Sequence, residues 1–339
     1  MSRHRTVYVT SRPQIHRDMA LEAAPGALDI DLLVAPDKAT IIEALAGAEF
    51  LVSDRAGDID ADIIAAGRDL RLIQRLGARC HDIDLDAAAA AGVPVCCWPL
   101  PQSAMVAEHT MMLVLALAKR LRDSMNVMID GSDWGTPQEC DANTFAMNWT
   151  RRSGISMLTG ETVGIVAMGE IGTELALRLR VFGCEVRYHN RRRLPTRAED
   201  RIGVQYRPLD ELLAECRIVC LLVPYSPETV GMTDATFLEK MQPGALLVSC
   251  GASTTLDEQA VADAYVRGGL GGVATDGHRW EPARPDGPLV LLSRDPAANV
   301  VLTPHSAQGN LQLTAEMRAP EYTNLVRILA GEPLLHRVG

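Results

Sequence analysis

The segment from residue 161 to 190 constrains the fold more than any other, and it reads ETVGIVAMGEIGTELALRLRVFGCEVRYHN. An apolar run, a glycine-rich turn, a helical pattern and a second apolar run predict a strand–turn–helix–strand unit of a parallel sheet. The positions of the dinucleotide fingerprint GxGxxG hold Ala167, Gly169 and Gly172. The second glycine lets the backbone approach a pyrophosphate, and the third lets the helix pack on the strand. Alanine at the first position is tolerable if its φ is negative. The turn predicts dinucleotide binding, with a tight turn that binds no ligand as the alternative.

The end of the second strand indicates which dinucleotide is bound. A site for NAD usually carries Asp or Glu here, about 20 residues after the glycines, to bind the ribose 2′-hydroxyl. This chain has Asn190, Arg191, Arg192 and Arg193 instead. Guanidinium groups pair with a 2′-phosphate through charge-assisted hydrogen bonds. We therefore expect NADP(H) to be preferred and NAD(H) to be possible, with a solvated basic turn as the alternative.

The first hundred residues alternate short apolar runs with helical patterns, which places the chain in the α/β class. The expected strands are 6–10, 28–35, 49–54, 70–77 and 93–99, and the expected helices are 40–47, 61–67 and 83–92. A long helix is expected from Ser103 to Val127, and a polar loop with two tryptophans follows it. Loops of such length are usually functional or form interfaces.

Composition excludes several classes of function. A formal net charge of −10 does not suit nonspecific DNA binding, which needs clustered cationic side chains. No signal-peptide core and no run long enough to span a bilayer are expected. The eight cysteines show no zinc-binding spacing, so no metal site is expected, and Cys216 and Cys220 are expected on one helix. Reduced thiols and a cytoplasmic location are the default.

Several motifs together resemble the D-isomer-specific 2-hydroxyacid dehydrogenase family, including its members similar to glyoxylate/hydroxypyruvate reductase. They are SAMVAEHTMMLVLALAKRL, ETVGIVAMGEIG, LLVPYSPETVGM, LDEQAV, WEP and LTPHSA. The resemblance implies two Rossmann-like domains with doubly wound parallel sheets, the nucleotide domain inserted into the substrate domain. On that pattern, residues 104–303 form the nucleotide domain, and residues 1–103 with 304–339 form the substrate-binding, catalytic domain. It also implies a homodimer, with the long helix and the tryptophan-bearing loop as the expected contact surfaces.

The resemblance implies a catalytic pair in the cleft between the domains. The motif TPHSA supplies His305, and DGHRWEP supplies Asp276 and, at the catalytic position, Glu281. The imidazole would donate a proton to the carbonyl oxygen during reduction and remove it during oxidation. The carboxylate would hold the tautomer of the imidazole and raise its pKa. A retained structural hydrogen bond is the alternative. The expected cofactor-binding residues are Gly169, Glu170, Ile171, Gly172, Asn190, Arg191, Arg192, Pro224, Thr229, Cys250, Asp276 and His305.

The family's third catalytic residue, an arginine in a motif similar to N-T-A-R-G-G-x-V-D-E, is missing here. In SCGASTTLDE its position holds Ala252. In a second loop, GARCHDID, Arg79 replaces a family glycine and His81 replaces an Asp. The hypothesis is that Arg79 supplies the cationic contact that Ala252 has lost; the alternative is that it points to solvent. The expected substrate-binding residues are Gly77, Ala78, Arg79 and Ala252.

Two functions remain open. The first is an NADP(H)-preferring oxidoreductase that acts on a 2-oxoacid, a 2-hydroxyacid or a related carbonyl compound. The missing arginine suggests an unusual substrate, and alanine at position 252 favours a bulky one. The second is a nucleotide-binding, largely non-catalytic sensor or scaffold. Retention of Glu281 and His305 argues against the second. In either case the expected partners are a small molecule and a second copy of the chain, with no nucleic acid and no membrane.

Overall fold

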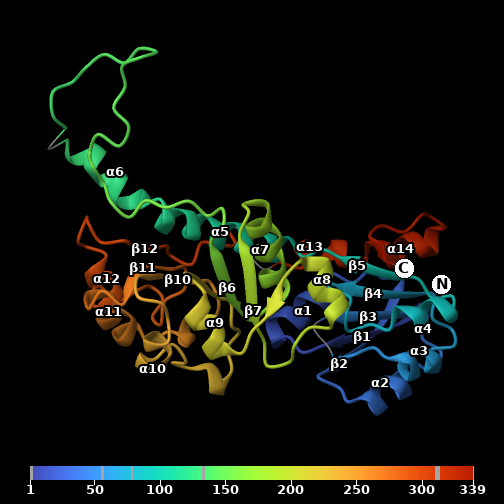
Figure 1. Cartoon of the computed structure of the whole chain (residues 1–339). Helices are drawn as coiled ribbons and strands as arrows, with labels where there is room; N and C mark the ends of the chain where they lie inside the picture. The colour runs from blue at the N-terminus through green and yellow to red at the C-terminus, as the bar shows by residue number, and fades with distance from the viewer. Residues whose placement is uncertain (1–2, 55–56, 78, 132–133, 310–313, 339) are drawn as a thin grey trace. The chain divides into compact units, whose positions relative to one another are not determined.

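The computed structural model describes residues 3–54, 57–77, 79–131, 134–309 and 314–338. The chain divides into two compact units (Figure 1). The first unit is Met1–Pro101 with Asn310–Gly339, and the second is Gln102–Gly309. The chain therefore leaves the first unit once and returns to it at its end.

The first unit is built on a six-stranded sheet in the order β13-β5-β4-β3-β1-β2. Strands β1 to β5 are parallel, and β13 pairs antiparallel with β5. The order 2-1-3-4-5 is a common doubly wound arrangement with helices on both faces. The strands are β1 (His4–Thr10), β2 (Leu28–Val34), β3 (Phe50–Asp54), β4 (Leu72–Leu76), β5 (Val95–Trp98) and β13 (Arg337–Val338).

Helices flank this sheet, so β3 and β4 are buried along their whole length, including their polar residues Ser53, Asp54, Gln74 and Arg75. Three of the helices begin at an aspartate, Asp37, Asp60 or Asp84, whose carboxylate accepts a hydrogen bond from a backbone N–H of the first turn. The helices are α1 (Gln14–Glu22), α2 (Lys38–Ala44), α3 (Ala61–Ala66), α4 (Leu85–Ala90), α13 (Ala315–Arg318), η3 (Ala319–Tyr322) and α14 (Thr323–Ala330).

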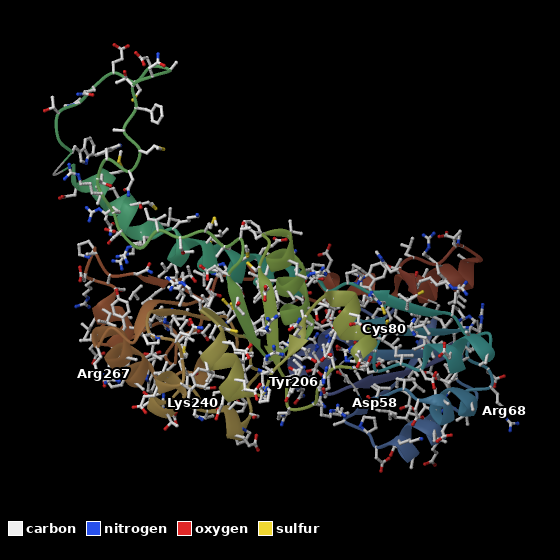
Figure 2. All side chains as sticks on the ribbon, viewed as in Figure 1. Asp58, Arg68, Cys80, Tyr206, Lys240 and Arg267 are labelled. Carbon is white, nitrogen blue, oxygen red and sulfur yellow. The ribbon has the colours of Figure 1, made fainter. Side chains whose placement is uncertain are left out.

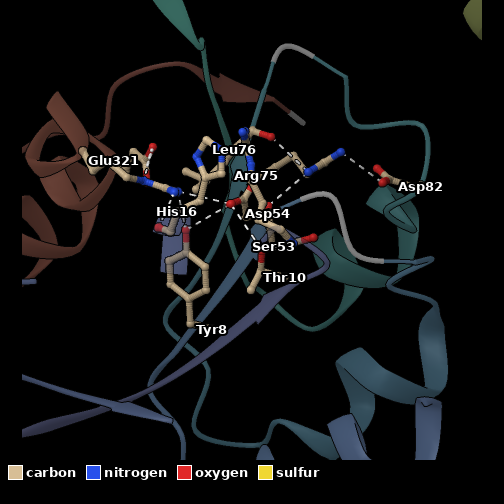
Figure 3. Close-up of polar contacts among 11 residues, drawn as sticks. Tyr8, Thr10, His16, Ser53, Asp54, Arg75, Leu76, Asp82 and Glu321 are labelled. Atoms are coloured by element: carbon tan, nitrogen blue, oxygen red, sulfur yellow. Dashed lines mark hydrogen bonds and ion pairs between the residues drawn. The ribbon is translucent and has the colours of Figure 1, made fainter. Parts of the chain in front are cut away.

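The returning C-terminal segment is tied to this sheet by Arg318 at the end of α13, whose partners Asp54 and Glu321 are labelled in Figure 3. Its guanidinium donates to both carboxylate oxygens of Glu321 at 2.8–3.1 Å, and to Asp54 Oδ2 at 3.1 Å. Asp54, at the end of β3, also accepts from Arg12 at 3.1 Å. All four side chains are mostly buried, so two guanidinium groups and two carboxyl groups interact away from water, and burial raises the pKa of Glu321 to about 7.

The second unit contains a seven-stranded parallel sheet in the order β12-β11-β10-β9-β6-β7-β8. Without the edge strand β12, the sheet has the doubly wound order 3-2-1-4-5-6, in which these numbers stand for β8, β7, β6, β9, β10 and β11. The direction in which strands are added reverses between β6 and β9, and this place is the topological switch point. Neighbouring residues of β9 point to opposite faces of the sheet, so they belong to two separate apolar clusters, one on each face. The strands are β6 (Thr162–Val166), β7 (Glu185–His189), β8 (Gln205–Tyr206), β9 (Ile218–Leu221), β10 (Ala245–Ser249), β11 (Leu270–Thr275) and β12 (Val300–Leu302).

The helices of the second unit include the long apolar α5, which supplies buried residues to one of these clusters. Within the described ranges, no helix is long and apolar enough to cross a membrane. The helices are α5 (Pro101–Ala118), α6 (Leu121–Asp130), α7 (Glu170–Val181), α8 (Thr196–Ile202), α9 (Leu209–Glu215), η1 (Pro227–Thr229), α10 (Ala235–Glu239), η2 (Ser253–Thr255), α11 (Glu258–Val266) and α12 (Pro288–Leu292).

The single helix expected from Ser103 to Val127 is wrong, because the chain forms α5 and α6 with a break between them. Arg120 adopts a left-handed φ of 48° at the break. Its side chain donates to the Ala297 carbonyl at 2.9 Å, and the Ser156 N–H donates to the last carbonyl of α5, that of Ala118, at 2.8 Å. Contacts distant in sequence therefore stop the helix.

The pairing of Cys216 and Cys220 on one helix is also wrong. Cys216 caps the end of α9 and Cys220 lies in β9. After α6 an arm without regular secondary structure runs to β6; we define it as residues 134–157 (Figure 1). Within it the rings of Trp134 and Trp149 meet edge to face, with centroids 5.6 Å apart.

Candidate active site

Several residues of the expected site in the second unit lie just after strands of one parallel sheet. Ala167 follows β6, Asn190 follows β7, and Cys250 follows β10. Asp276 follows β11, and His305 lies shortly after β12. The carboxyl ends of parallel strands share one edge, and ligands of open α/β sheets bind there. The sheet therefore gathers residues spread over more than a hundred positions of sequence.

The glycine-rich turn joins β6 to α7. A Cβ at Gly172 would lie 2.7 Å from the Ala167 carbonyl oxygen, so only glycine allows this close packing. A Cβ at Gly169 would meet nothing within 4 Å, which leaves open space at the N-terminus of α7. Of the two residues between them, Glu170 is buried and Ile171 packs partly buried on the core. A helix N-terminus with free space before it suits a phosphate group.

Alanine at position 167 was expected to be tolerable if its φ is negative, and the structure does not meet this condition. The φ of Ala167 is +79°, in the left-handed region that favours glycine. A non-glycine residue there costs about 1–2 kcal/mol. The turn therefore keeps the backbone geometry of the fingerprint without its first glycine.

The residues after β7 differ in their contacts. Asn190 Oδ1 accepts a hydrogen bond from the Met168 N–H at 2.7 Å, which links this loop to the glycine-rich turn. Arg191 and Arg192 are exposed. Arg193 forms a two-pronged ion pair with Glu199. The three arginines are therefore not equivalent, and the first two project into solvent.

Beyond β9 and β10 the expected cofactor residues lie in tight turns. The Thr229 hydroxyl donates to the Pro224 carbonyl oxygen at 3.1 Å, so the two residues form one turn. Burial raises the pKa of the Cys250 thiol to about 12. A thiol that stays protonated at neutral pH is a poor nucleophile, so the structure favours a packing role for this cysteine.

The position of the missing arginine is a tightly closed loop. The Ala252 N–H donates to the Val223 carbonyl oxygen at 2.8 Å, and the Thr255 hydroxyl donates to the Ala252 carbonyl oxygen at 2.7 Å. A Cβ at Gly251 would lie 2.6 Å from backbone atoms of Val223. Thr254 Oγ1 is buried without a hydrogen-bond partner in the described part of the chain. The loop thus offers small side chains and hydroxyl groups, and no charge.

His305 and Glu281 are joined directly. The distance from His305 Nδ1 to Glu281 Oε2 is 2.8 Å, and the two side chains are 62% and 40% exposed. A carboxylate accepts this bond, so Nδ1 carries the proton and Nε2 is left for a reacting group. Burial would raise the pKa of Glu281, but hydrogen bonds from His305 and from the His278 N–H outweigh it and lower the pKa. The carboxylate therefore stays ionised at neutral pH.

Asp276 organises the loop that carries His305. Its Oδ1 accepts from the Thr303 hydroxyl at 2.6 Å and the Ser306 N–H at 2.9 Å, and its Oδ2 accepts from the Ala307 N–H at 2.9 Å. Its backbone carbonyl accepts from the His305 N–H at 2.8 Å. His305 has a left-handed φ of 53°, a strained geometry that such a network can hold. Asp276, expected as a cofactor residue, has both oxygens engaged within the protein.

Two histidines in this network were missed by sequence reasoning. His109 Nε2, on α5, lies 2.9 Å from Thr303 Oγ1 and 3.2 Å from Asp276 Oδ1. His278 Nε2 donates to the Thr303 carbonyl oxygen at 2.9 Å. His109 was visible as a polar residue within an apolar helix, which is the one signal that could have indicated it.

The expected substrate loop of the first unit follows β4. Gly77 is buried with a φ of 118°, Arg79 is half-buried, and Ala78 lies outside the described residues. Arg75, which sequence reasoning missed, has a side chain that is only 2% exposed. It donates to the carbonyl oxygens of Arg79, Ser53 and Leu76 at 3.0–3.1 Å and pairs with Asp82 at 3.3 Å (Figure 3). This buried cation therefore holds both ends of the loop.

Comparison with known proteins gives a consistent result. The model of the D-isomer specific 2-hydroxyacid dehydrogenase NAD binding domain matches residues 111–307. A D-3-phosphoglycerate dehydrogenase of Mycobacterium leprae (strain TN) is 32% identical over 300 residues, 88% of this chain and 52% of that protein. The chain thus spans about half the length of that curated relative. A glyoxylate reductase of Korarchaeum cryptofilum (strain OPF8) is 30% identical over 298 residues, 88% of this chain and 84% of that protein.

A solved structure agrees with the fold. The crystal structure of the PH0520 protein from Pyrococcus horikoshii OT3 matches with a TM-score of 0.58 and 26% identity, over 99% of this chain and 95% of that one. The similarity therefore extends over both units of the chain.

Proposed function

Because the chain belongs to the D-isomer specific 2-hydroxyacid dehydrogenase family, we propose that it is an oxidoreductase that interconverts a 2-hydroxyacid and a 2-oxoacid, or a related alcohol and carbonyl compound, with a nicotinamide cofactor. The observation that carries the proposal is the 2.8 Å contact between His305 and Glu281 at the carboxyl edge of the second sheet. An imidazole held by a carboxylate is a general acid and base in one group.

The residues divide the proton chemistry between them. When bound, a nicotinamide cofactor would supply the hydride in reduction and accept it in oxidation. His305 Nε2 donates a proton to the carbonyl oxygen in reduction and takes it from the hydroxyl in oxidation. Glu281 holds the tautomer and stabilises the imidazolium that oxidation produces. Asp276 acts through the loop as a positioning residue.

The residues of the turn fit a dinucleotide, and the arginines favour one with a 2′-phosphate. The space at Gly169 accommodates a pyrophosphate at the N-terminus of α7. Arg191 and Arg192 are exposed after β7, where a carboxylate would otherwise repel the extra phosphate. We therefore propose that NADP(H) is preferred and that NAD(H) is a weaker alternative.

The proposed substrate is a small-molecule oxoacid or a related carbonyl compound, and among such compounds we favour a bulky one. At position 252, an alanine side chain is smaller than an arginine side chain, which favours a bulky substrate. The missing arginine would have made a hydrogen bond to a charged group, worth about 1.5–3 kcal/mol. Arg79 is proposed to supply the missing cationic contact. Its backbone is held by Arg75, which supports a defined position. If Arg79→Ala left both turnover and KM unchanged, this role would be excluded.

A homodimer is proposed to form through the arm and α6. Exposed apolar side chains are concentrated there, among them Met128, Ile129, Phe145, Met147 and Met157. Large apolar patches on a surface are usually covered by a partner. Continuity along one protruding segment favours a second copy that packs the same segment.

The alternative function is a nucleotide-binding, largely non-catalytic protein. The uncharged loop at Ala252 is compatible with it. The paired His305 and Glu281 oppose it, because a protein that only binds a nucleotide has no chemical need for an imidazole held by a carboxylate.

The test is oxidation of NADPH and of NADH, followed by absorbance, with 2-oxoacids from glyoxylate to arylpyruvates. Turnover with NADPH, faster than with NADH and greatest for the bulky oxoacids, is expected. Tight binding of NADPH without turnover of any oxoacid would favour the non-catalytic alternative. Turnover with NADH alone would support the reaction and overturn the cofactor preference.

A further inference from the structure

The loop that follows β7 is held at both of its ends. At the first end Asn190 accepts from the Met168 N–H at 2.7 Å. At the other end the buried Leu194 donates its N–H to the Tyr188 hydroxyl at 2.8 Å. Between these two hydrogen-bonded positions, residues 191–192 are exposed. The loop therefore presents two arginines on a short, fixed stretch of backbone.

Arg193 lies at the centre of the contacts that fix the second end of this loop. Its Nε and Nη2 donate to the two carboxylate oxygens of Glu199 at 2.8 and 2.6 Å. The Tyr188 hydroxyl donates to Glu199 Oε1 at 2.6 Å, and the Arg193 guanidinium lies 5.6 Å from the ring centre of Tyr206, which Figure 2 labels. Glu199 is 5% exposed, in the first turn of α8. We call Tyr188, Arg193 and Glu199 the latch.

The charge of Glu199 is part of this arrangement. The hydrogen bond from Arg193 lowers the pKa of Glu199 against the raising effect of burial. The carboxylate is therefore ionised at neutral pH and neutralises Arg193. Of the three consecutive arginines, the third is occupied by the protein itself.

We propose that the latch is a positioning element that sets the cofactor specificity, by holding Arg191 and Arg192 where they grip the 2′-phosphate of NADP(H). This inference rests on the proposed preference for NADP(H). A loop ordered before binding avoids the conformational entropy cost of ordering it on the ligand. The two-pronged geometry of guanidinium–phosphate contacts makes affinity sensitive to the position of the backbone.

A purely electrostatic role for Glu199 predicts the opposite result of substitution. A carboxylate near a phosphate site repels the phosphate, so Glu199→Gln would tighten NADPH binding if charge alone mattered. If the latch positions the loop, the same substitution weakens NADPH binding, because Arg193 loses its ionised partner. The sign of the change therefore separates the two explanations.

The experiment measures the Kd of NADPH and of NADH by fluorescence titration of the full chain at one ionic strength. The variants are Glu199→Gln and Tyr188→Phe, which removes one hydroxyl and no charge. The matched control is Arg197→Ala, which removes an exposed arginine from the same helix. We expect the latch variants to weaken NADPH binding by about 5- to 30-fold, the range of one to two hydrogen bonds, and NADH binding by less than about 2-fold. The control should change both by less than about 2-fold.

The outcomes separate the latch from the cofactor proposal. Wild-type protein that binds NADH as tightly as NADPH overturns the cofactor proposal and the latch with it. A wild-type preference that is lost in the Arg191→Ala, Arg192→Ala double variant but kept in both latch variants overturns the latch alone. Tighter NADPH binding by Glu199→Gln also overturns it. If Glu199→Gln does not fold, as judged by its melting curve, Tyr188→Phe decides.

Discussion

The paired imidazole and carboxylate of His305 and Glu281 allow a test of the proposed reaction at single residues. His305→Asn removes the acid and base, so kcat should fall by about 10²–10⁴-fold. Glu281→Gln keeps a hydrogen-bond acceptor but removes the charge, so a smaller fall in kcat with an altered pH profile is expected. Steady-state kinetics of NADPH oxidation measure both.

The chain contains a matched control for this experiment. His4 and Glu49 form an imidazole–carboxylate pair at the same distance of 2.8 Å, at the start of β1 in the first unit. His4→Asn should leave kcat within about 2-fold, since its pair lies away from the carboxyl edge of the strands. A loss of activity by both histidine variants would indicate a general effect on folding.

Ala167 permits a test that depends on the backbone alone. Glycine relieves the cost of its left-handed φ, about 1–2 kcal/mol, and loses about 0.4–1 kcal/mol through the greater freedom of the unfolded chain. Ala167→Gly should therefore leave the free energy of unfolding equal or raise it by up to about 1.6 kcal/mol in urea titrations. Ala65→Gly, on an exposed face of α3, should lower it by about 1 kcal/mol. Equal losses in the two variants would contradict the strain at Ala167.

At the scale of elements, the arm predicts the assembly state. Phe145 and Met147 are 62% and 83% exposed. If they are buried against a second copy, Phe145→Ser with Met147→Ser should raise the dimer dissociation constant at least about 100-fold, because each large apolar side chain contributes about 1.5–3 kcal/mol when buried. Sedimentation velocity measures this. Val266→Ser, on α11 and 71% exposed, is the control and should not change the assembly. A wild-type monomer would exclude the proposed dimer.

Helices and strands that follow from the local sequence pattern could be predicted, whereas features that depend on contacts between residues distant in sequence could not. The strand, turn and helix from Thr162 to Val181 follow from apolar periodicity and from glycine at position 172. The break at Arg120 follows from contacts with Ala297 and Ser156, which no local pattern displays. The same limit hid Arg75, because an arginine inside an apolar strand pattern does not reveal which carbonyl oxygens surround it.

At the scale of the whole molecule, the doubly wound architecture was implied by resemblance, whereas the contacts between distant segments were visible only in the structure. Residues 167 and 190 could be assigned to one sheet edge from the predicted strand–turn–helix–strand unit, and the structure adds residues 250, 276 and 305 to that edge. The latch could not, since Glu199 reads as an ordinary surface residue of a short helix. Arg318 likewise lies 264 positions from Asp54, and nothing near either residue indicates their contact.

Arg318 therefore provides the prediction for the molecule as a whole. Arg318→Met leaves the carboxylates of Asp54 and Glu321 buried without their shared cation, which should lower the free energy of unfolding by about 3–5 kcal/mol at pH 7. Arg327→Met removes a cation from the exposed pair with Glu332 in the same C-terminal segment and should cost less than about 1 kcal/mol. Urea titrations of both variants and of the wild type measure the difference.

The pH dependence of the stability difference between wild type and Arg318→Met distinguishes loss of the buried charge from simple loss of packing. Burial would raise the pKa of Asp54, but the charges of Arg12 and Arg318 outweigh it and lower the pKa below the ordinary value of 3.8. The stability that Asp54 contributes is therefore complete above that value and is lost as the pH falls through the lower pKa of the folded state. Burial already raises the pKa of Glu321 to about 7 in the wild type, and Arg318 opposes this rise. In Arg318→Met both buried carboxyl groups take up protons at a higher pH than in the wild type, which relieves the penalty. The stability difference between wild type and variant should consequently shrink as the pH is lowered from 7 to 4. A difference that stays constant over this range would mean that the apolar stem of Arg318, and not its charge, ties the returning segment to the sheet.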